Sequence, residues 1–178
     1  NQLPFTVSIW FRSSAPVGQS TAPDVVGLIG KYSAASWNGW QLGLDEFNGT
    51  INPWYLPSRA NNVIGDYDNR APFESAPFLA DARWHQAVFT IDTTGGILYV
   101  DGVEAARQAW LGSAVATAST YPMVMGVYVG NTPYYFKGDL DELRLYQRVL
   151  TATEVRDLFA LEFSGVVPVL PAITSPPS

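Results

Sequence analysis

Alternation of apolar and polar residues over short segments is the feature that most restricts how this chain can fold. In FTVSIWF, every second residue from Phe5 to Phe11 is apolar, as in a β-strand with one buried face. The pattern recurs along the chain between clusters of Gly, Pro, Asn and Asp, and it predicts about ten short strands. These segments are residues 5–11, 25–32, 39–46, 49–56, 62–67, 83–92, 97–102, 103–110, 123–130 and 138–146.

One helix is predicted, close to the C-terminal end. Thr151 is followed three residues later by Glu154, which is the capping-box pattern, and Val155, Leu158 and Phe159 then share one helical face. Many strands without alternating helices favour an all-β fold, an antiparallel two-sheet β-sandwich of jelly-roll type with a short C-terminal helix.

The chain reads as one domain followed by a linker. Residues 1–165 form the predicted domain, in which 57–82 and 131–136 are predicted loops. Residues 166–178 hold four prolines in thirteen positions, which predicts a linker to a further domain. Pro53 removes a backbone donor from its strand and therefore predicts an edge position or a β-bulge.

Composition excludes several classes of protein. There is no Cys, which rules out disulfides and thiolate zinc sites, and the single His excludes sites with several histidines. The net charge is −6 and the ten basic residues are scattered, so neither nucleic acid nor an anionic membrane surface is an expected partner. The acidic, cysteine-free and aromatic composition fits a secreted bacterial protein, and no membrane span is visible.

Two segments carry a resemblance to a known family. DARWHQAVFTIDTTGGILYVDGVE (81–104) resembles the central hairpin of the laminin G-like, concanavalin A-like jelly rolls, and GDLDELRLYQRVLTATEVRDLF (138–159) resembles their closing strand and helix. The resemblance covers residues 5–160. It implies a concanavalin A-like jelly roll acting as a lectin-like, carbohydrate-binding module of a secreted bacterial multidomain protein, with a glycan or cell-surface polysaccharide as partner.

Three carboxylates in GDLDELRLY raise the question of catalysis. Glucanases of the resembled fold carry their acids on one strand, but here the final acid position falls on Leu143 or Arg144. Simple alternation places Leu143 on one face with Asp139 and Asp141, and Glu142 on the other. His85 has no serine in an exposed elbow motif and is predicted to be a structural histidine at the sheet rim. An enzyme is therefore not predicted, and a glycoside hydrolase or lyase stays the weaker alternative.

Aromatic and polar residues outside the strand interiors suggest a carbohydrate platform, since sugars stack on aromatic rings and hydrogen-bond to polar neighbours. Packing of each ring under its own loop is the competing interpretation for every member. The strand aromatics Trp10, Trp40, Trp84 and Phe89 are predicted to be core. The predicted platform consists of Trp37, Trp54, Tyr55, Arg59, Tyr67, Asn131, Tyr134 and Tyr135.

The resemblance also implies a structural calcium ion, with Asp141 as a ligand. Calcium requires six to eight oxygen ligands, and a plain turn hydrogen bond from Asp141 is the alternative. The cluster DYDN at 66–69 fails the EF-hand pattern. A protein-interaction or adhesion module that binds no sugar is the alternative function from another class.

Overall fold

The computed structural model describes residues 3–13, 25–33, 36–45, 49–57, 73, 79–129 and 133–164. Within these ranges it contains eleven strands and one helix. They are β1 (Phe5–Ser13), β2 (Val25–Ser33), β3 (Asn38–Asp45), β4 (Ile51–Leu56), β5 (His85–Ile91), β6 (Gly95–Val100), β7 (Val103–Ala109), β8 (Val124–Met125), β9 (Val127–Val129), β10 (Pro133–Tyr135), β11 (Gly138–Tyr146) and α1 (Ala152–Phe163).

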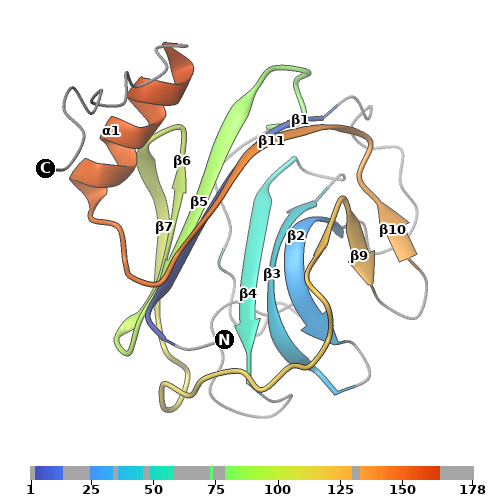
Figure 1. Cartoon of the computed structure of the whole chain (residues 1–178), viewed down its shortest axis with the longest axis vertical. Helices are drawn as coiled ribbons and strands as arrows, with labels where there is room; N and C mark the ends of the chain where they lie inside the picture. Colours follow the sequence, from blue (N-terminus) through green and yellow to red (C-terminus); the bar gives the residue numbers. More distant parts are fainter. Residues whose placement is uncertain are drawn as a thin grey trace, which may run out of the picture.

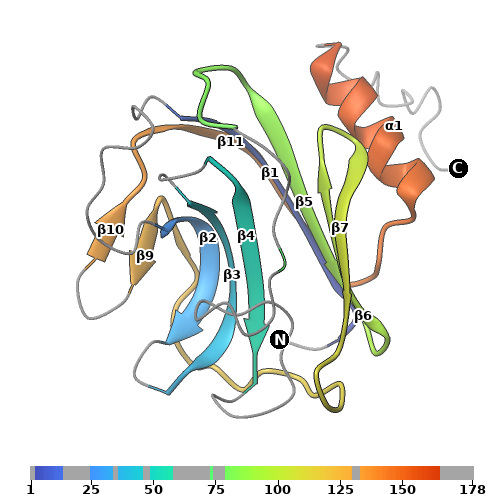
Figure 2. The ribbon, with the colours of Figure 1, turned by 180° about the vertical axis from the view of Figure 1, so that it is seen from behind.

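The strands form two facing antiparallel sheets (Figures 1 and 2). The five-stranded sheet has the order β11-β1-β5-β6-β7, and the four-stranded sheet has the order β4-β3-β2-β8. The short pair β9 and β10 lies beside β2. The predicted antiparallel sandwich of jelly-roll type with one C-terminal helix is thereby confirmed. Pro53 lies in β4, at an edge, as predicted.

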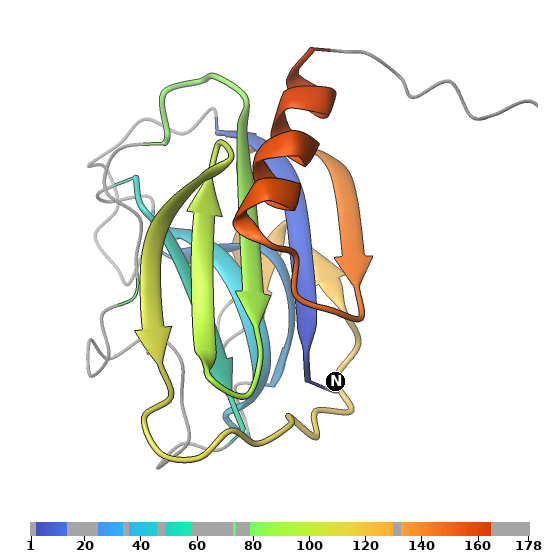
Figure 3. The ribbon, with the colours of Figure 1, turned by 90° about the vertical axis from the view of Figure 1, so that its left-hand side faces the viewer.

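The main core fills the space between the sheets. Val7, Ile9 and Phe11 on the inner face of β1 are fully buried, and they meet Trp40 and Leu42 of the opposite sheet. The outer face of the five-stranded sheet is covered as well, because α1 lies across it (Figure 3). Here Val155 of the helix packs with Val88 of β5. Strand β1 is therefore buried on both faces.

Local sequence signals explain the ends of these elements. The Thr151 hydroxyl accepts a hydrogen bond from the Glu154 backbone N–H at 3.2 Å, and the Glu154 carboxylate accepts one from the Thr151 N–H at 2.8 Å. This is the predicted capping box. Between β6 and β7, Asp101 and Gly102 have φ angles of 50° and 77°, which the predicted Asp-Gly hairpin turn requires.

Strand β11 departs from simple alternation. Its register against β1 shifts between Ser8 and Trp10, and Glu142 has a φ angle of 47°, so the strand contains a β-bulge. The extra residue changes which side chains face inward, and Leu143 packs against the main core. Asp141, the register partner of Trp10, lies on the outer face. The prediction that Leu143 shares a face with Asp141 is wrong for this reason.

Other predictions differ in smaller ways. The segment predicted as strand 123–130 is divided into β8 and β9 at Gly126, whose φ angle is 69°. Strand β10 occupies part of the predicted loop 131–136. Trp84 is 37% exposed, which corrects its assignment to the core, whereas Trp10, Trp40 and Phe89 are buried as predicted. The predicted strand 62–67 and linker 166–178 lie outside the described residues.

Candidate functional site

Two residues of the predicted carbohydrate platform are core residues. Trp54 is 1% exposed and Tyr55 is fully buried. They are neighbours on β4 and face opposite sides of the sheet. Tyr55 enters the main core, where its hydroxyl accepts a hydrogen bond from the Thr117 N–H at 2.7 Å. Neither ring has a free face for a sugar, so their assignment as surface contacts is corrected.

Other platform residues gather around Trp54 on the outer face of the four-stranded sheet. Tyr32 and Tyr128 meet its ring edge-on, each at 5.9 Å, and Trp37 packs against the same cluster. Tyr134 stacks on Tyr128 at 6.1 Å. The predicted platform residues Trp37, Trp54 and Tyr134 are thus linked through Tyr128, but most of the surface of these rings is covered by packing.

Of the remaining residues of the predicted platform, one is exposed and three lie outside the described part of the chain. Tyr135 is 66% exposed and follows Tyr134 in β10, so strand alternation turns its side chain to the other face. Arg59, Tyr67 and Asn131 lie outside the described residues. Trp37, Tyr134 and Tyr135 are therefore the platform residues that retain exposed surface.

A different surface brings exposed aromatic rings together with carboxylates. A cleft of about 280 Å³ lies between the bulge of β11, the residue preceding β5 and the last turn of α1. We call it the helix-side cleft. It is lined by Trp10, Trp84, Asp141, Glu142, Glu162 and Phe163.

The floor of the helix-side cleft is aromatic. Trp10 points outward from β1, and its ring stacks on Phe159 of α1 at a centroid distance of 5.5 Å and an interplanar angle of 10°. Phe163, one helical turn later, stacks on Trp10 at 6.5 Å and on Phe159 at 5.4 Å. Stacking between the helix and β1 thus sets the position of the last helical turn.

A buried carboxylate fixes this arrangement. The Glu162 side chain is 5% exposed and accepts hydrogen bonds from three strands. Trp10 Nε1 and Arg144 Nε donate to it at 2.5 Å each, and Gln86 Nε2 donates at 2.7 Å. Gln86 is fully buried, and its amide oxygen has no partner among the residues that the structure describes.

Two exposed rings form the walls. Trp84 immediately precedes β5, and the Arg12 guanidinium lies 5.1 Å from the centre of its ring. Arg12 is held by the Asp139 carboxylate at 2.7 Å. Phe163 is 71% exposed. A flat apolar ligand face can therefore reach aromatic surface from solvent.

The rim is acidic. The bulge presents Asp141 and Glu142 next to each other, and Asp141 Oδ1 accepts a hydrogen bond from the Glu142 N–H at 2.8 Å. Glu142 pairs with Arg144 at 2.7 Å. Asp141 has no cationic partner among the described residues. The cleft is lined by three carboxylates, and Arg144 pairs with two of them, so these four groups together have a formal charge of −2.

Asp141 does not complete a calcium site with its described neighbours. Its side chain accepts the turn hydrogen bond from the Glu142 N–H, whereas calcium takes six to eight oxygens. Within the part of the chain that the structure describes, no three His, Cys, Asp or Glu side chains converge as metal ligands would. The described residues therefore give Asp141 no cluster of side-chain ligands, and the calcium that the resemblance implies stays a prediction.

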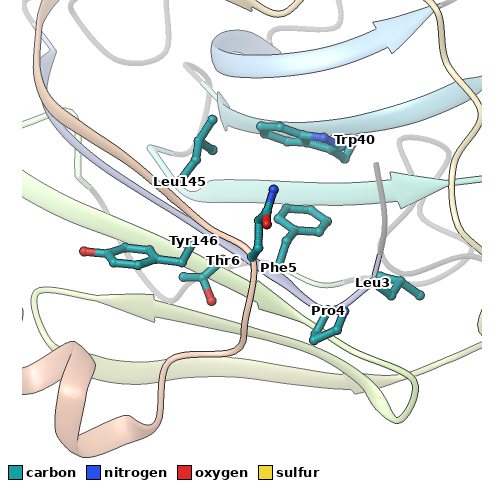
Figure 4. A pocket seen from close by; sticks show the side chains of 8 residues that line it. Leu3, Pro4, Phe5, Thr6, Trp40, Leu145 and Tyr146 are labelled. Atoms are coloured by element: carbon teal, nitrogen blue, oxygen red, sulfur yellow. The ribbon is translucent and has the colours of Figure 1, made fainter.

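A larger pocket, of about 630 Å³, lies near the N-terminal end of β1 (Figure 4). Phe5 and Trp40 lie side by side in it, with ring centres 5.4 Å apart, and both belong to the packing of the main core. The Thr6 hydroxyl is committed to the Arg148 carbonyl at 2.8 Å. None of the described residues that line this pocket carries a charged side chain, so these residues offer less to orient a polar ligand than those of the helix-side cleft.

His85 has a structural environment. Its ring is held between two carboxylates, with Asp101 2.7 Å from Nδ1 and Asp81 3.0 Å from Nε2. The hydrogen bond to Asp101 raises the pKa of His85, although burial opposes the shift. A second oxygen of Asp101 accepts from the Gln86 N–H at 2.8 Å. Both ring nitrogens are thus engaged in joining the turns at one end of the sandwich.

Sequence reasoning did not identify Trp84, Glu162 or Phe163 as site residues. Trp84 lies in the motif ARWH at the start of a predicted strand, where a large apolar residue suggests an anchor in the core. Its position before the first paired residue of β5 was the available signal of exposure. Glu162 and Phe163 lie in LEFSG, beyond the predicted helical segment, and nothing local relates them to Trp10.

Comparisons with known proteins agree with this architecture. Residues 1–156 match the family described as the concanavalin A-like lectin/glucanases superfamily. No curated protein matches the sequence significantly. Among the described residues, no helix is long and apolar enough to cross a membrane.

Solved structures with a similar fold include carbohydrate-binding domains. Domain 4 of AbnA, an extracellular arabinanase from Geobacillus stearothermophilus, in complex with arabinotriose, has 20% identity and a TM-score of 0.57, covering 87% of this chain and 66% of that one. The CBM40 of the Ruminococcus gnavus IT-sialidase, bound to α2,3-sialyllactose, has 13% identity and a TM-score of 0.62, covering 88% and 82%.

An enzyme is similar over a smaller part of its length. The Trypanosoma rangeli sialidase has 17% identity and a TM-score of 0.62, and the alignment covers 89% of this chain but 23% of the sialidase. At these identities the similarity shows the fold alone. The chain spans less than two thirds of both AbnA domain 4 and this sialidase.

Proposed function

The chain belongs to the concanavalin A-like lectin/glucanase superfamily, and on that premise we propose that it is a non-catalytic carbohydrate-binding module of a secreted bacterial multidomain protein. The helix-side cleft is its proposed glycan site. The observation that carries this proposal is the combination of exposed Trp84 with the carboxylates of Asp141 and Glu142 around one cleft.

The cleft has the chemistry that a sugar ring needs. The C–H face of a pyranose can stack on Trp84 or Phe163, and its hydroxyls can donate to the acidic rim. The volume of about 280 Å³ is near the lower end of ordinary ligand sites, which suits one or two sugar rings. The extracellular arabinanase domain with bound arabinotriose supports the same class of ligand and an extracellular location.

The described carboxylates support binding rather than hydrolysis. A glycosidase needs a protonated carboxyl group aimed at the leaving oxygen. Glu162 already accepts hydrogen bonds from Trp10, Gln86 and Arg144, and Glu142 accepts from the same Arg144. Both of these carboxylates are held in place by Arg144, and neither is free to be aimed at a leaving oxygen. Asp141, the third carboxylate of the cleft, is then left without a free carboxylate partner for a two-carboxylate mechanism.

The β10 surface is the second candidate site. On the side of β10 that carries Tyr134, Trp37 and Tyr134 retain exposed area, and the buried Trp54 Nε1 and Gln41 Nε2 donors have no partner among the described residues. Trp54 and Gln41 are register partners on adjacent strands, so their side chains share a face. A ligand rich in acceptor oxygens would suit these donors if it reached them.

A glycan array separates these interpretations. The wild-type chain is compared with Trp84→Ala and Trp37→Ala, both of which remove partly exposed rings outside the main core. Loss of all hits in Trp84→Ala alone supports the helix-side cleft, and loss in Trp37→Ala alone transfers the site to the β10 surface. An array without hits, with and without added calcium, contradicts sugar binding and favours an adhesion module. Cleavage of a bound glycan would contradict the non-catalytic assignment.

A further inference from the structure

We infer that the helix-side cleft selects sugars that carry a free ammonium group, such as glucosamine units, over neutral or N-acetylated sugars. This inference rests on the proposed function and names its ligand class. It starts from the hydrogen-bonding groups that the cleft leaves unused, because these decide what a ligand must supply.

Much of the donor capacity around the floor is committed. Trp10 Nε1, Gln86 Nε2 and Arg144 Nε all donate to Glu162, and Arg144 Nη2 donates to Glu142. The amide oxygen of Gln86 has no partner among the described residues, but this side chain is fully buried and does not line the cleft. The acceptors that a ligand can reach are therefore the carboxylates of the rim.

The rim adds an acceptor that is also charged. Asp141 accepts one backbone hydrogen bond and makes no ion pair with any residue that the structure describes. An ammonium group supplies three donors, no acceptor and one positive charge, and therefore complements this set. An anionic sugar would bring more acceptors and a repelled charge. A neutral sugar would leave the charge of Asp141 unmatched.

The aromatic wall can take the apolar face of the sugar ring that carries the ammonium group. The Arg12 guanidinium lies over the Trp84 ring at 5.1 Å, so this indole already sits in a cation–π contact. The part of Trp84 that lines the cleft can face the C–H groups next to a ligand ammonium. The three carboxylates line the cleft without converging on one point, which suits a group carried on a sugar ring better than a bare metal ion.

The test uses three tetrasaccharides with the same β-1,4 linkage, built from glucosamine, N-acetylglucosamine or glucose. Affinities are measured by calorimetry at pH 5.5, where the amine is protonated, in low and high salt. We expect the glucosamine form to bind about two- to fivefold more tightly than the other two, the gain expected of one exposed ion pair. The preference should shrink in high salt because the pair is screened.

Variants assign the preference to its residue. Asp141→Asn keeps the shape of the side chain and removes its charge, and it is expected to abolish the preference while neutral-sugar binding persists. Asp157→Asn makes the same change in net charge on an exposed part of α1 that does not line the cleft, and it should leave the preference intact.

The outcomes are distinguishable. Equal binding of the three sugars, sensitive to Trp84→Ala, overturns the ammonium inference and leaves the proposed function standing. Absence of binding to all three, together with an empty glycan array, overturns both. Nα-acetyl-lysine methylamide, which keeps its side-chain ammonium group, is used as a competitor. If it competes as effectively as glucosamine, the assignment to a sugar is overturned and a protein lysine is indicated as the partner.

Discussion

Replacement of Glu162 by Ala should loosen α1 from the sheet and strongly destabilise the fold. The variant leaves Trp10 Nε1 and Gln86 Nε2, donors from residues that are 6% and 0% exposed, without an acceptor. A buried donor that loses its partner costs about 1–3 kcal/mol. Arg144 has a side chain that is 41% exposed and can turn to water, so its loss adds less than about 1 kcal/mol.

The two buried donors together give an expected loss of about 3–5 kcal/mol in the free energy of unfolding. For a chain of this size, that corresponds to a fall in Tm of about 6–20 °C. Glu162→Gln retains one acceptor oxygen and is expected to lose about 1–2 kcal/mol. Urea unfolding followed by far-UV circular dichroism measures both values, and tryptophan fluorescence reports the environment of Trp10.

The control is Asp157→Ala, which removes an exposed carboxylate from the same helix and should change stability by less than about 0.5 kcal/mol. If Glu162→Ala proves no more destabilising than Asp157→Ala, then this carboxylate does not anchor the helix, and the reasoning that builds the cleft on it fails. A Trp10→Phe, Glu162→Ala double-mutant cycle should show coupling of about 0.5–3 kcal/mol, because the two side chains are in contact.

Three further predictions concern stability. Although partial burial opposes it, hydrogen bonds from Arg83 and His85 lower the pKa of Asp81 to about 2, and the pKa of His85 is raised, chiefly by Asp101. Their contribution should be complete from about pH 4 to 6.5, decline as pH rises through the raised pKa of His85 and decline in acid towards pH 2. The urea midpoint measured as a function of pH should show both declines. If the midpoint of His85→Gln falls as steeply above pH 6.5 as that of the wild type, the role given to His85 is contradicted. Thr151→Ala should cost about 1 kcal/mol by removing the N-cap, and an unchanged Tm would argue against it. EDTA should leave the Tm unchanged, whereas a fall of several degrees would identify calcium bound with ligands beyond those described around Asp141.

The parts of the fold that the sequence predicts are those decided locally. Asp101 and Gly102 adopt the positive φ angles that such a pair favours, and Thr151 caps the helix that its spacing from Glu154 indicates. Strand positions follow from alternation because one face of each strand must be buried. These features depend on neighbours in the chain, so a single sequence contains the information.

The candidate site could not be predicted in the same way because it depends on contacts between distant segments. Trp54 and Tyr55 lie at the end of the predicted strand 49–56, beside Asn and Pro, which suggested an exposed strand end, yet β4 pairs with β3 there and buries both rings on opposite faces. Trp84 shows the opposite error. Its motif suggested an anchor in the core, but the pairing of β5 with β1 begins one residue later, at His85, and Trp84 is exposed.

The bulge in β11 accounts both for the missing catalytic pattern and for the cleft. Without the extra residue at Glu142, alternation from Asp141 would turn Arg144 towards the core. With it, Arg144 lies opposite Ser8 on the outer face and reaches both Glu142 and Glu162. The irregularity therefore places the cation that joins the acidic rim to the last turn of α1. Among the described residues it leaves Asp141 beside that rim without a cation of its own, and the proposed preference for a positively charged sugar rests on this arrangement.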